Sequence, residues 1–373
     1  MKIAIINGFD TYEHRVDLIY KYFTRNGNHV SVFTSNYQHI EKKKRNKEKE
    51  NFTYIETMEY KRNLSIDRIL SHIKLSKDIF SFLENDYDLL WVLVPPNSLV
   101  KQGIKYKRKN KTVKLVFDLI DLWPETMPIG KLKDSFPFKL WKNIRDKNLY
   151  NADHIVTECK LFQNFLPKEI NPLKISNLYL SYGNDIIARN FNMLNLSGQE
   201  LSLCYLGSMN NIIDNNVIKN IIQSLSKNYK VKFHIIGDGE KKSELLQLID
   251  SISNLEIIDH GKIYDNKLKT DILSSCHFGL NIMKKDVLVG LTMKSLDYFK
   301  NGIPIINNIS GDTWEFVENC GVGINTTDGF ISSLVIQNYL ENFAKIQDFY
   351  QNKFSEDTFN VELSKILKEI LDY

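Results

Sequence analysis

Short apolar runs alternate along almost the whole chain with longer stretches in which apolar residues recur at helical spacing. A short apolar run is typical of a buried strand, and the helical spacing is typical of a helix with one buried face. In the first half, the pattern predicts strands at residues 2–8, 29–35, 88–96, 113–121, 153–159 and 175–183. It predicts helices at residues 16–27, 66–84 and 97–109, and a charged loop at residues 40–52. Strands that alternate with helices in this way indicate a parallel sheet covered by helices on both faces.

The pattern starts again after a polar stretch at residues 184–199. The second series contains predicted strands at residues 201–208, 231–239, 255–263, 277–283, 303–309 and 322–325. Its predicted helices include residues 214–227, 240–252, 332–348 and 356–371. Two such series in 373 residues indicate two domains, because a single hydrophobic core rarely grows so large.

The predicted fold class is therefore α/β, with two doubly wound Rossmann-like domains facing a central cleft. We expect an N-terminal domain at residues 1–185 and a C-terminal domain at residues 186–348. Residues 349–373 are expected to form a C-terminal helix that packs back towards the N-terminal domain. Ligands of such sheets lie at the carboxyl ends of the strands, so functional side chains are expected in the loops that follow strands.

Composition narrows the class of protein. Hydrophobic residues make up 43% of the chain and charged residues 25%, which is typical of a globular protein. The chain has no apolar run of about eighteen residues, and its N-terminus reads as a first strand rather than a signal peptide. Four widely separated cysteines predict reduced thiols in a cytoplasmic protein: Cys159, Cys204, Cys276 and Cys320. The net charge of +4 is too small to indicate a nucleic-acid partner.

Basic residues concentrate in the first half of the chain, where aromatic residues lie among them. Residues 136–147 are an example, with Phe136, Phe138, Leu140 and Trp141 among lysines and an arginine. Two interpretations are open for this segment. It can lie on the inner leaflet of a membrane as a basic amphipathic helix, or it can be an ordinary helix that packs its aromatic face inward.

The segment from Val289 to Ile306 carries the most specific chemical signal. Gly290 makes a turn into a short predicted helix, and a buried strand follows that helix. Free backbone N–H groups and the positive end of the dipole at the start of a helix favour a phosphate. Lys294 and Asp297 lie three residues apart on one face of this helix. One can meet a phosphate and the other can accept from sugar hydroxyls, so the segment indicates a nucleotide-sugar site.

Each of these residues also has a purely structural interpretation. Lys294 can point to solvent, although the helix dipole disfavours a cation in the first turn unless an anion is bound. Asp297 can pair with Lys300 or Lys294 on the helix surface. Gly290 can serve the turn alone, and the Thr292 hydroxyl can cap the helix.

Three motifs follow one another in the second half: the Gly207 loop after a strand, the Gly237-Asp238-Gly239 turn after the next strand, and the helix that ends at Asn301-Gly302-Ile303-Pro304. Upstream, residues 118–125 read DLIDLWPE and residues 151–157 read NADHIVT. Together these motifs resemble GT-B glycosyltransferases, family 4 in particular, of the bacterial capsular, exopolysaccharide or lipopolysaccharide type. The resemblance spans nearly the whole chain.

The resemblance implies a nucleoside diphosphate sugar donor of the UDP, dTDP or GDP type, with no cofactor and no metal ion. The expected donor-binding residues are Gly207, Ser208, Gly237, Lys262, Asp286, Gly290, Leu291, Thr292 and Asp297. The expected catalytic residues are Lys294, Asp121 and Asp118, and the expected acceptor-binding residues are Gly8, His14 and Glu125. For Asp121, a helix cap or loop anchor is the alternative, and for His14 the alternative is a structural histidine.

The activity that the resemblance implies is that of a retaining, metal-independent glycosyltransferase of the hexosyltransferase type (EC 2.4). It would move a sugar to a hydroxyl of a glycan linked to polyprenyl diphosphate, at the cytoplasmic face of the membrane, in surface polysaccharide synthesis. Val289 stands where the family has a glutamate, and the Gly207 loop lacks the usual basic residues. These departures motivate an alternative function: a catalytically silent GT-B-like subunit that binds or activates a partner glycosyltransferase. A dinucleotide-dependent enzyme is a weaker alternative, because residues 6–10 lack the glycine pattern of its first turn.

Overall fold

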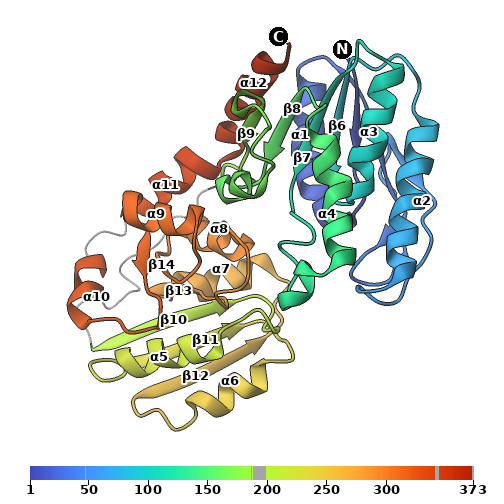
Figure 1. Ribbon diagram of the computed structural model, residues 1–373. Helices are drawn as coiled ribbons and strands as arrows, with labels where there is room; N and C mark the ends of the chain where they lie inside the picture. Colours follow the sequence, from blue (N-terminus) through green and yellow to red (C-terminus); the bar gives the residue numbers. More distant parts are fainter. Residues whose placement is uncertain (47, 186, 188–198, 341–343, 372–373) are drawn as a thin grey trace. The chain divides into compact units, whose positions relative to one another are not determined.

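The computed structural model describes residues 1–46, 48–185, 187, 199–340 and 344–371 (Figure 1). The chain forms two compact units, which are unit 1 (Met1–Leu180 with Asn360–Tyr373) and unit 2 (Ser181–Phe359). Residues 181–185 pack on unit 2, where Lys300 Nζ donates to Tyr182 O at 2.7 Å. The sequence pattern predicts the boundary between the two domains after residue 185. A polar segment between two domains does not show in its sequence which of the two domains it packs against.

Unit 1 contains a seven-stranded parallel sheet in the order β5-β2-β1-β6-β7-β8-β9. Its strands are β1 (Lys2–Ile6), β2 (His29–Ser35), β5 (Phe52–Ile55), β6 (Leu89–Val94), β7 (Lys114–Leu119), β8 (His154–Thr157) and β9 (Ile175–Asn177). Its helices are α1 (Glu13–Arg25), α2 (Ile66–Phe82), α3 (Asn97–Lys109) and α4 (Phe136–Leu149), with short 3-10 turns η1 (Asp10–Tyr12), η2 (Gly130–Asp134), η3 (Lys160–Phe165) and η4 (Pro172–Lys174). Every residue of β6 is buried, as expected for a central parallel strand covered on both faces.

Unit 2 contains a six-stranded parallel sheet in the order β12-β11-β10-β13-β14-β15. Its strands are β10 (Glu200–Leu206), β11 (Lys230–Ile236), β12 (Leu255–Gly261), β13 (Phe278–Asn281), β14 (Ile305–Asn307) and β15 (Gly323–Asn325). Its helices are α5 (Asn215–Leu225), α6 (Lys242–Ile249), α7 (Asn266–Ser274), α8 (Met293–Lys300), α9 (Asp312–Cys320), α10 (Ser333–Leu340) and α11 (Ala344–Phe354). Helix α12 (Glu356–Leu371) begins in unit 2 and ends in unit 1. The predicted α/β class with two Rossmann-like halves is confirmed.

The strand order reverses once in each sheet. In unit 1 the reversal lies between β1 and β6, and in unit 2 it lies between β10 and β13. At such a switch point the loops after the two strands run to opposite faces of the sheet and leave a crevice at the carboxyl ends. The two switch points are therefore the first places in which to look for functional side chains.

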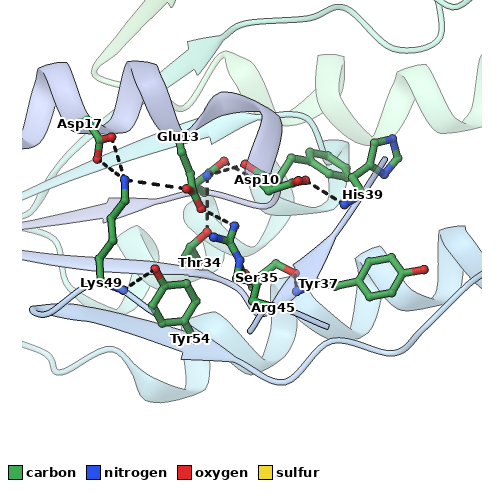
Figure 2. Close-up of polar contacts among 12 residues, drawn as sticks. Asp10, Glu13, Asp17, Thr34, Ser35, Tyr37, His39, Arg45, Lys49 and Tyr54 are labelled. Atoms are coloured by element: carbon green, nitrogen blue, oxygen red, sulfur yellow. Dashed lines mark hydrogen bonds and ion pairs between the residues drawn. The ribbon is translucent and has the colours of Figure 1, made fainter. Parts of the chain in front are cut away.

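The segment predicted as a charged loop at residues 40–52 is more ordered than its composition indicates. Strands β3 (Tyr37–Gln38) and β4 (Lys43–Lys44) form a small antiparallel hairpin before β5 begins. Figure 2 shows how the hairpin is fixed to unit 1: the His39 amide donates to Asp10 Oδ1 at 2.8 Å, and Arg45 pairs with Glu13. Lys49 continues the attachment with two bonds of 2.7 Å to Asp17. The charges that suggested a solvated loop are therefore used for anchoring.

Two further sequence expectations differ from the structure. The helix predicted at residues 332–348 is two helices, α10 and α11, and residues 341–343 between them lie outside the described part of the chain. In helix α4 the ring centroids of Trp141 and Trp123 lie 5.8 Å apart, as in a helix that packs an aromatic side chain inward, while Phe136 and Leu140 are 79% and 54% exposed. Of the helices that the structure describes, none has the length and apolar content needed to cross a membrane.

Candidate functional site

Lys294 lies at the switch point of unit 2, in the first turn of α8. Its Nζ donates to Tyr205 Oη at 3.1 Å and lies 4.2 Å from the centroid of the Tyr205 ring. Its Cε is 4.0 Å from the point that a Cβ on Gly207 would occupy, so the Gly207 loop and α8 meet here. Among the described residues, no carboxylate forms an ion pair with this lysine. Burial lowers the pKa of Lys294 to about 7, as expected for a cation that lacks a counter-ion.

The start of α8 is fixed by its cap. Thr292 is the N-cap, and its Oγ1 accepts from the Ser295 amide at 3.2 Å and donates to Asn281 Oδ1 at 2.8 Å. The amides of Met293 and Lys294 lie in the first turn of α8, where backbone N–H groups have no acceptor within the helix. Helix geometry therefore leaves them available to a ligand. The positive end of the dipole adds to the charge of Lys294, and the combination favours an anion.

A row of three hydrogen-bonded asparagines, which we call the asparagine ladder, holds this cap in place. Strands β13, β14 and β15 all end in asparagine, and parallel pairing brings Asn281, Asn307 and Asn325 side by side. Asn281 Nδ2 donates to Asn307 Oδ1, and Asn307 Nδ2 donates to Asn325 Oδ1, both at 2.8 Å. Because Asn281 also holds Thr292, the ladder connects three strand ends to the first turn of α8. The sequence analysis did not predict this network. The pattern that could have predicted it is an asparagine at the end of each of three successive strands.

Glycines bring the backbone of two neighbouring loops into direct contact on the other side of the switch point. A Cβ at Gly237 would lie 2.0 Å from Gly207 O, and a Cβ at Gly239 would lie 2.3 Å from Met209 O. Gly237 and Gly239 also have φ values of 148° and 155°, which side chains disfavour. The Gly207 loop and the turn predicted at residues 237–239 are therefore packed together by backbone alone, with Ser208 exposed at the tip.

The remaining donor-side predictions are more dispersed. Asp297 shares α8 with Lys294, but its Oδ1 accepts from Lys269 Nζ at 3.1 Å rather than from either lysine named in the sequence alternative. Lys262 is exposed, with its Nζ 3.9 Å from Asp238 Oδ2, and Asp286 is exposed in the loop after β13. The carbonyl oxygen of Gly290 accepts hydrogen bonds from the amide and the hydroxyl of Thr313. Leu291, the next residue, is half-buried.

Asp118, predicted to be catalytic, has the contacts of a structural residue. Asp118 is fully buried within β7, where its two oxygens accept from Arg15 Nε and Nη2, each at 2.8 Å. Trp91 Nε1 donates a third bond at 2.9 Å. A carboxylate with this burial and these partners is a structural anchor between β7, α1 and β6. The sequence could not separate the two roles, because a strand-end aspartate has the same appearance in both.

Glu125, predicted to bind the acceptor, is not a free carboxylate in the structure. Glu125 pairs with Arg145 at 2.7 Å and with Lys142 at 2.9 Å. Burial alone would raise the pKa of Glu125, but hydrogen bonds and charge from these two residues lower it. Asp121 accepts from Trp123 Nε1 at 2.7 Å, which agrees with the loop-anchor alternative, and burial raises its pKa.

The other two acceptor-side residues lie near the switch point of unit 1. Gly8 follows β1 and permits close packing, because a Cβ there would lie 2.4 Å from Pro96 Cδ. His14 is exposed in the first turn of α1. The structure adds Glu158, which sequence analysis missed although an acid directly after the buried strand HIVT was its signal. Burial, together with the charges of Asp121 and Asp118, raises the pKa of Glu158 to about 8. Among the described residues, no group of three His, Cys, Asp or Glu side chains could hold a metal ion.

Comparison with known proteins gives a likeness of structure and none of sequence. No protein-family model and no curated protein matches the chain. HepE of Anabaena, crystallised with UDP, superimposes with a TM-score of 0.63 at 13% identity, covering 99% of this chain and 100% of that one. Sucrose-phosphate synthase of Thermosynechococcus elongatus gives 0.68 at 11% identity, covering 100% and 99%. The lipopolysaccharide outer core galactosyltransferase WaaB gives 0.60 at 14% identity, covering 100% and 99%. The chain therefore has the fold of the GT-B glycosyltransferases.

Proposed function

We propose that this chain is a glycosyltransferase that moves a sugar from a nucleoside diphosphate sugar to a hydroxyl group of a glycan acceptor. The observation that carries the proposal is Lys294, a half-buried cation at the start of α8 and at the switch point of unit 2, for which the described residues supply no acidic partner. A diphosphate at this point would meet the ammonium group, the first amides of α8 and the glycine backbone of the Gly207 loop. Unit 2 would then be the donor-binding domain and unit 1 the acceptor-binding domain.

The proposed chemistry follows from these groups. Departure of the nucleoside diphosphate leaves negative charge on the phosphates, and a fixed ammonium group with aligned amides stabilises that charge where it develops. An anion beside Lys294 raises its pKa, so the lysine is fully charged when the donor is bound. Asp297 would accept from the ribose after releasing Lys269, and Lys262, Ser208, Asp286 and Leu291 would line the nucleotide. The proposed mechanism is retaining and needs no metal ion.

The finer assignment concerns the substrates. HepE has been crystallised with UDP-glucose, so UDP-sugars are the first donors to test. The sequence resemblance to family 4 polysaccharide enzymes supports an acceptor glycan on polyprenyl diphosphate and a role in surface polysaccharide synthesis. In that setting the enzyme would work at the cytoplasmic face of the membrane, with the exposed Phe136 and Leu140 of α4 as contacts with lipid.

The first experiment is a thermal-shift screen with UDP, dTDP, GDP and their sugars, followed by turnover measurements with the best donor. A ligand that binds only the folded state raises its stability by mass action, so the preferred nucleotide is expected to raise the Tm most. Lys294→Ala is then expected to lower kcat by about 100- to 1,000-fold, the usual effect of removing one charge-stabilising donor. Lys285→Ala, at an exposed lysine in the preceding loop, is the matched control. Equal turnover by the Lys294→Ala variant would remove this lysine from the mechanism, and the absence of any nucleotide shift would contradict the proposed donor site.

The second candidate function is a catalytically silent subunit that binds or activates a partner glycosyltransferase. Val289, half-buried just before the turn into α8, favours this function because it cannot bond a sugar hydroxyl. Nucleotide release from the donor, measured with the purified chain alone, separates the two functions. A transferase is expected to release nucleotide by slow hydrolysis or transfer, whereas a silent subunit releases none even though nucleotide binds.

A further inference from the structure

Four basic side chains gather at the switch point of unit 1, where the proposed function does not use them. His39 and Lys42 come from the β3–β4 hairpin, and Arg68 and His72 come from the first two turns of α2. Aromatic rings of Phe9, Tyr60 and Trp123 lie around and among them. We call these four residues the basic cluster. All four follow the carboxyl ends of parallel strands, which is where α/β sheets bind ligands.

Arg68 is the centre of the basic cluster. It is 4% exposed, and its guanidinium carbon lies 4.4 Å from the centroid of the Trp123 ring. Its Nη1 donates to Asn63 O at 2.7 Å and its Nη2 lies 3.3 Å from His39 Nε2, while its Nε has no partner. A guanidinium has five N–H donors, so Arg68 keeps donor capacity for a ligand, at Nε above all. Among the described residues no carboxylate pairs with Arg68, and a buried cation in that condition is costly.

His72 supplies an independent observation. It is 4% exposed, and neither of its ring nitrogens has a hydrogen-bond partner. Its ring packs between Phe9 and Trp123, with centroid distances of 5.1 and 6.0 Å. Buried polar atoms are nearly always satisfied in proteins, so this imidazole, beside a guanidinium with no acidic partner among the described residues, favours a binding site for a polar ligand. Asn97, at the start of α3, has an unpartnered Oδ1 in the same region of unit 1.

The charges of the basic cluster are unbalanced. Burial, reinforced by Arg68 and Lys42, lowers the pKa of His39 to about 3, and burial with Arg68 lowers the pKa of His72. Burial also lowers the pKa of Lys42 and of Arg68. Two nearby acids, Asp10 and Asp121, raise the pKa of Lys42 and of Arg68 but do not outweigh burial. Asp10 accepts from the His39 amide, and Asp121 accepts from the Trp123 indole. The two histidines are therefore neutral near pH 7, and an anion within the cluster would offset the repulsion between the charges of Arg68 and Lys42.

The hairpin part of the cluster is held in place without a ligand. Asp10 fixes the His39 backbone and Glu13 fixes Arg45 beyond the turn, as Figure 2 shows. Lys42 Nζ donates to His39 O and to Asn63 Oδ1 and lies 4.8 Å from the centroid of the Tyr60 ring. Because Arg68 only donates, His39 Nε2 accepts from it, so His39 Nδ1 carries the proton that meets Tyr60 Oη. These contacts place the cationic groups in advance of binding.

We infer that the basic cluster binds a phosphate group, with Arg68 as its main contact and Lys42 and the two histidines beside it. A phosphate offers several acceptor oxygens to the unused N–H groups of Arg68 and to the His72 ring, and it supplies the missing negative charge. The inference rests on the proposed function in one respect, namely that the phosphate belongs to the acceptor. The acceptor would then be a phosphorylated molecule that is recognised by its phosphate as well as by its sugar.

Calorimetric titration of the full chain with inorganic pyrophosphate tests this site. The titration is made in the Lys294→Gln background, which removes the main phosphate contact proposed for unit 2. That variant is expected to bind one pyrophosphate, and Arg68→Gln in the same background is expected to weaken the binding by about tenfold to hundredfold. Lys42→Gln changes a half-buried residue of the same cluster and tests the site even if Arg68→Gln does not fold. Lys61→Gln, at an exposed lysine before α2, is the matched control and is expected to bind as the background does.

The outcomes separate this inference from the proposed function. If the Lys294→Gln chain binds no pyrophosphate, or binds it equally well after both Arg68→Gln and Lys42→Gln, the phosphate site in unit 1 is overturned while the donor site stands. If nucleotides fail to bind the unmodified chain but pyrophosphate binding still depends on Arg68, the proposed function fails and the phosphate site stands. A parallel titration with farnesyl diphosphate tests the assignment to an acceptor: binding at least as tight as that of pyrophosphate supports it, and failure to bind overturns it.

Discussion

At the scale of single residues, buried charge separates anchors from candidate ligands in this protein. Asp118 and Arg15 are both buried, and they satisfy each other through two short bonds. Arg68 is buried as well and Lys294 is half-buried, but among the described residues neither has an acidic partner. An uncompensated charge that is removed from water destabilises the folded state. Replacement of either residue by an apolar one of similar size is therefore expected to raise the free energy of unfolding.

Asp118→Leu is expected to lower the free energy of unfolding by about 3–5 kcal/mol, because it leaves Arg15 as an unpaired buried cation. Urea unfolding measures the change. The double variant Arg15→Met with Asp118→Leu is the control, and it is expected to recover part of the loss. A loss of activity in Asp118→Leu without any loss of stability would contradict the structural role and return Asp118 to the active site.

Lys294→Met is expected to stabilise the protein in a pH-dependent way. Below pH 7 the lysine is charged in both the folded and the unfolded state, so folding must bury a charge. Between its folded pKa of about 7 and its ordinary value of 10.5, the unfolded state binds more protons, so the stability of the unmodified protein rises with pH. The variant is therefore expected to be more stable by about 1–3 kcal/mol below pH 7, with the difference shrinking as pH rises. Parallel stability profiles for the two proteins would mean that the pKa of Lys294 is not lowered in the folded state.

At the scale of elements, helix α8 is placed by its neighbours rather than by its own sequence. Its cap is held by the asparagine ladder, and its Tyr298 accepts from the Leu206 amide at 2.8 Å and packs on Gly279. Eight residues are too few for a stable isolated helix, so tertiary contacts must supply its stability. The position of Lys294 is thus determined by three strands and one glycine.

Gly279→Ala tests this placement. The added Cβ would lie 2.5 Å from Tyr298 Cγ, so α8 must shift outward, at an overpacking cost of about 1–3 kcal/mol. Nucleotide affinity is expected to fall along with stability, because the first turn of α8 moves with Tyr298. Gly103→Ala in unit 1 is the matched control, since its Cβ would lie 3.0 Å from Phe117 Cε1. It is expected to lower stability without changing nucleotide affinity, and an equal loss of affinity in both variants would contradict a specific effect on α8.

At the scale of the whole molecule, each unit has its own parallel sheet and its own hydrophobic core. Each also has a switch point with a basic side chain that has no acidic partner within the described part of the chain, the buried Arg68 in unit 1 and the half-buried Lys294 in unit 2. The proposed reaction needs two substrates, and two separate anion sites are what such a reaction requires if both substrates carry phosphate. The fold therefore provides one candidate site for each.

Differential scanning calorimetry is expected to resolve two unfolding transitions, one for each unit, because chains of this size with two cores seldom unfold in one step. The preferred nucleotide is expected to stabilise the transition of unit 2 by about 2.7 kcal/mol at a hundredfold excess over its Kd. Asp118→Leu is expected to lower the other transition and leave the nucleotide shift intact. A single transition that responds equally to both changes would show that the two units unfold as one.

The sequence by itself determined the α/β class, the repetition of the pattern, and the segment from Gly290 to Asp297. These follow from apolar periodicity and from helix-start chemistry, which are local properties of the chain. The tertiary structure alone decided that Asp118 and Glu125 are paired, that three distant asparagines support Thr292, and that Arg68 and Lys294 find no acidic partner among the residues that the structure describes. Pairing and burial depend on residues far apart in the chain, such as Arg15 and Asp118. The sequence could therefore name the charged groups, but only the folded contacts show which of them remain available to a ligand.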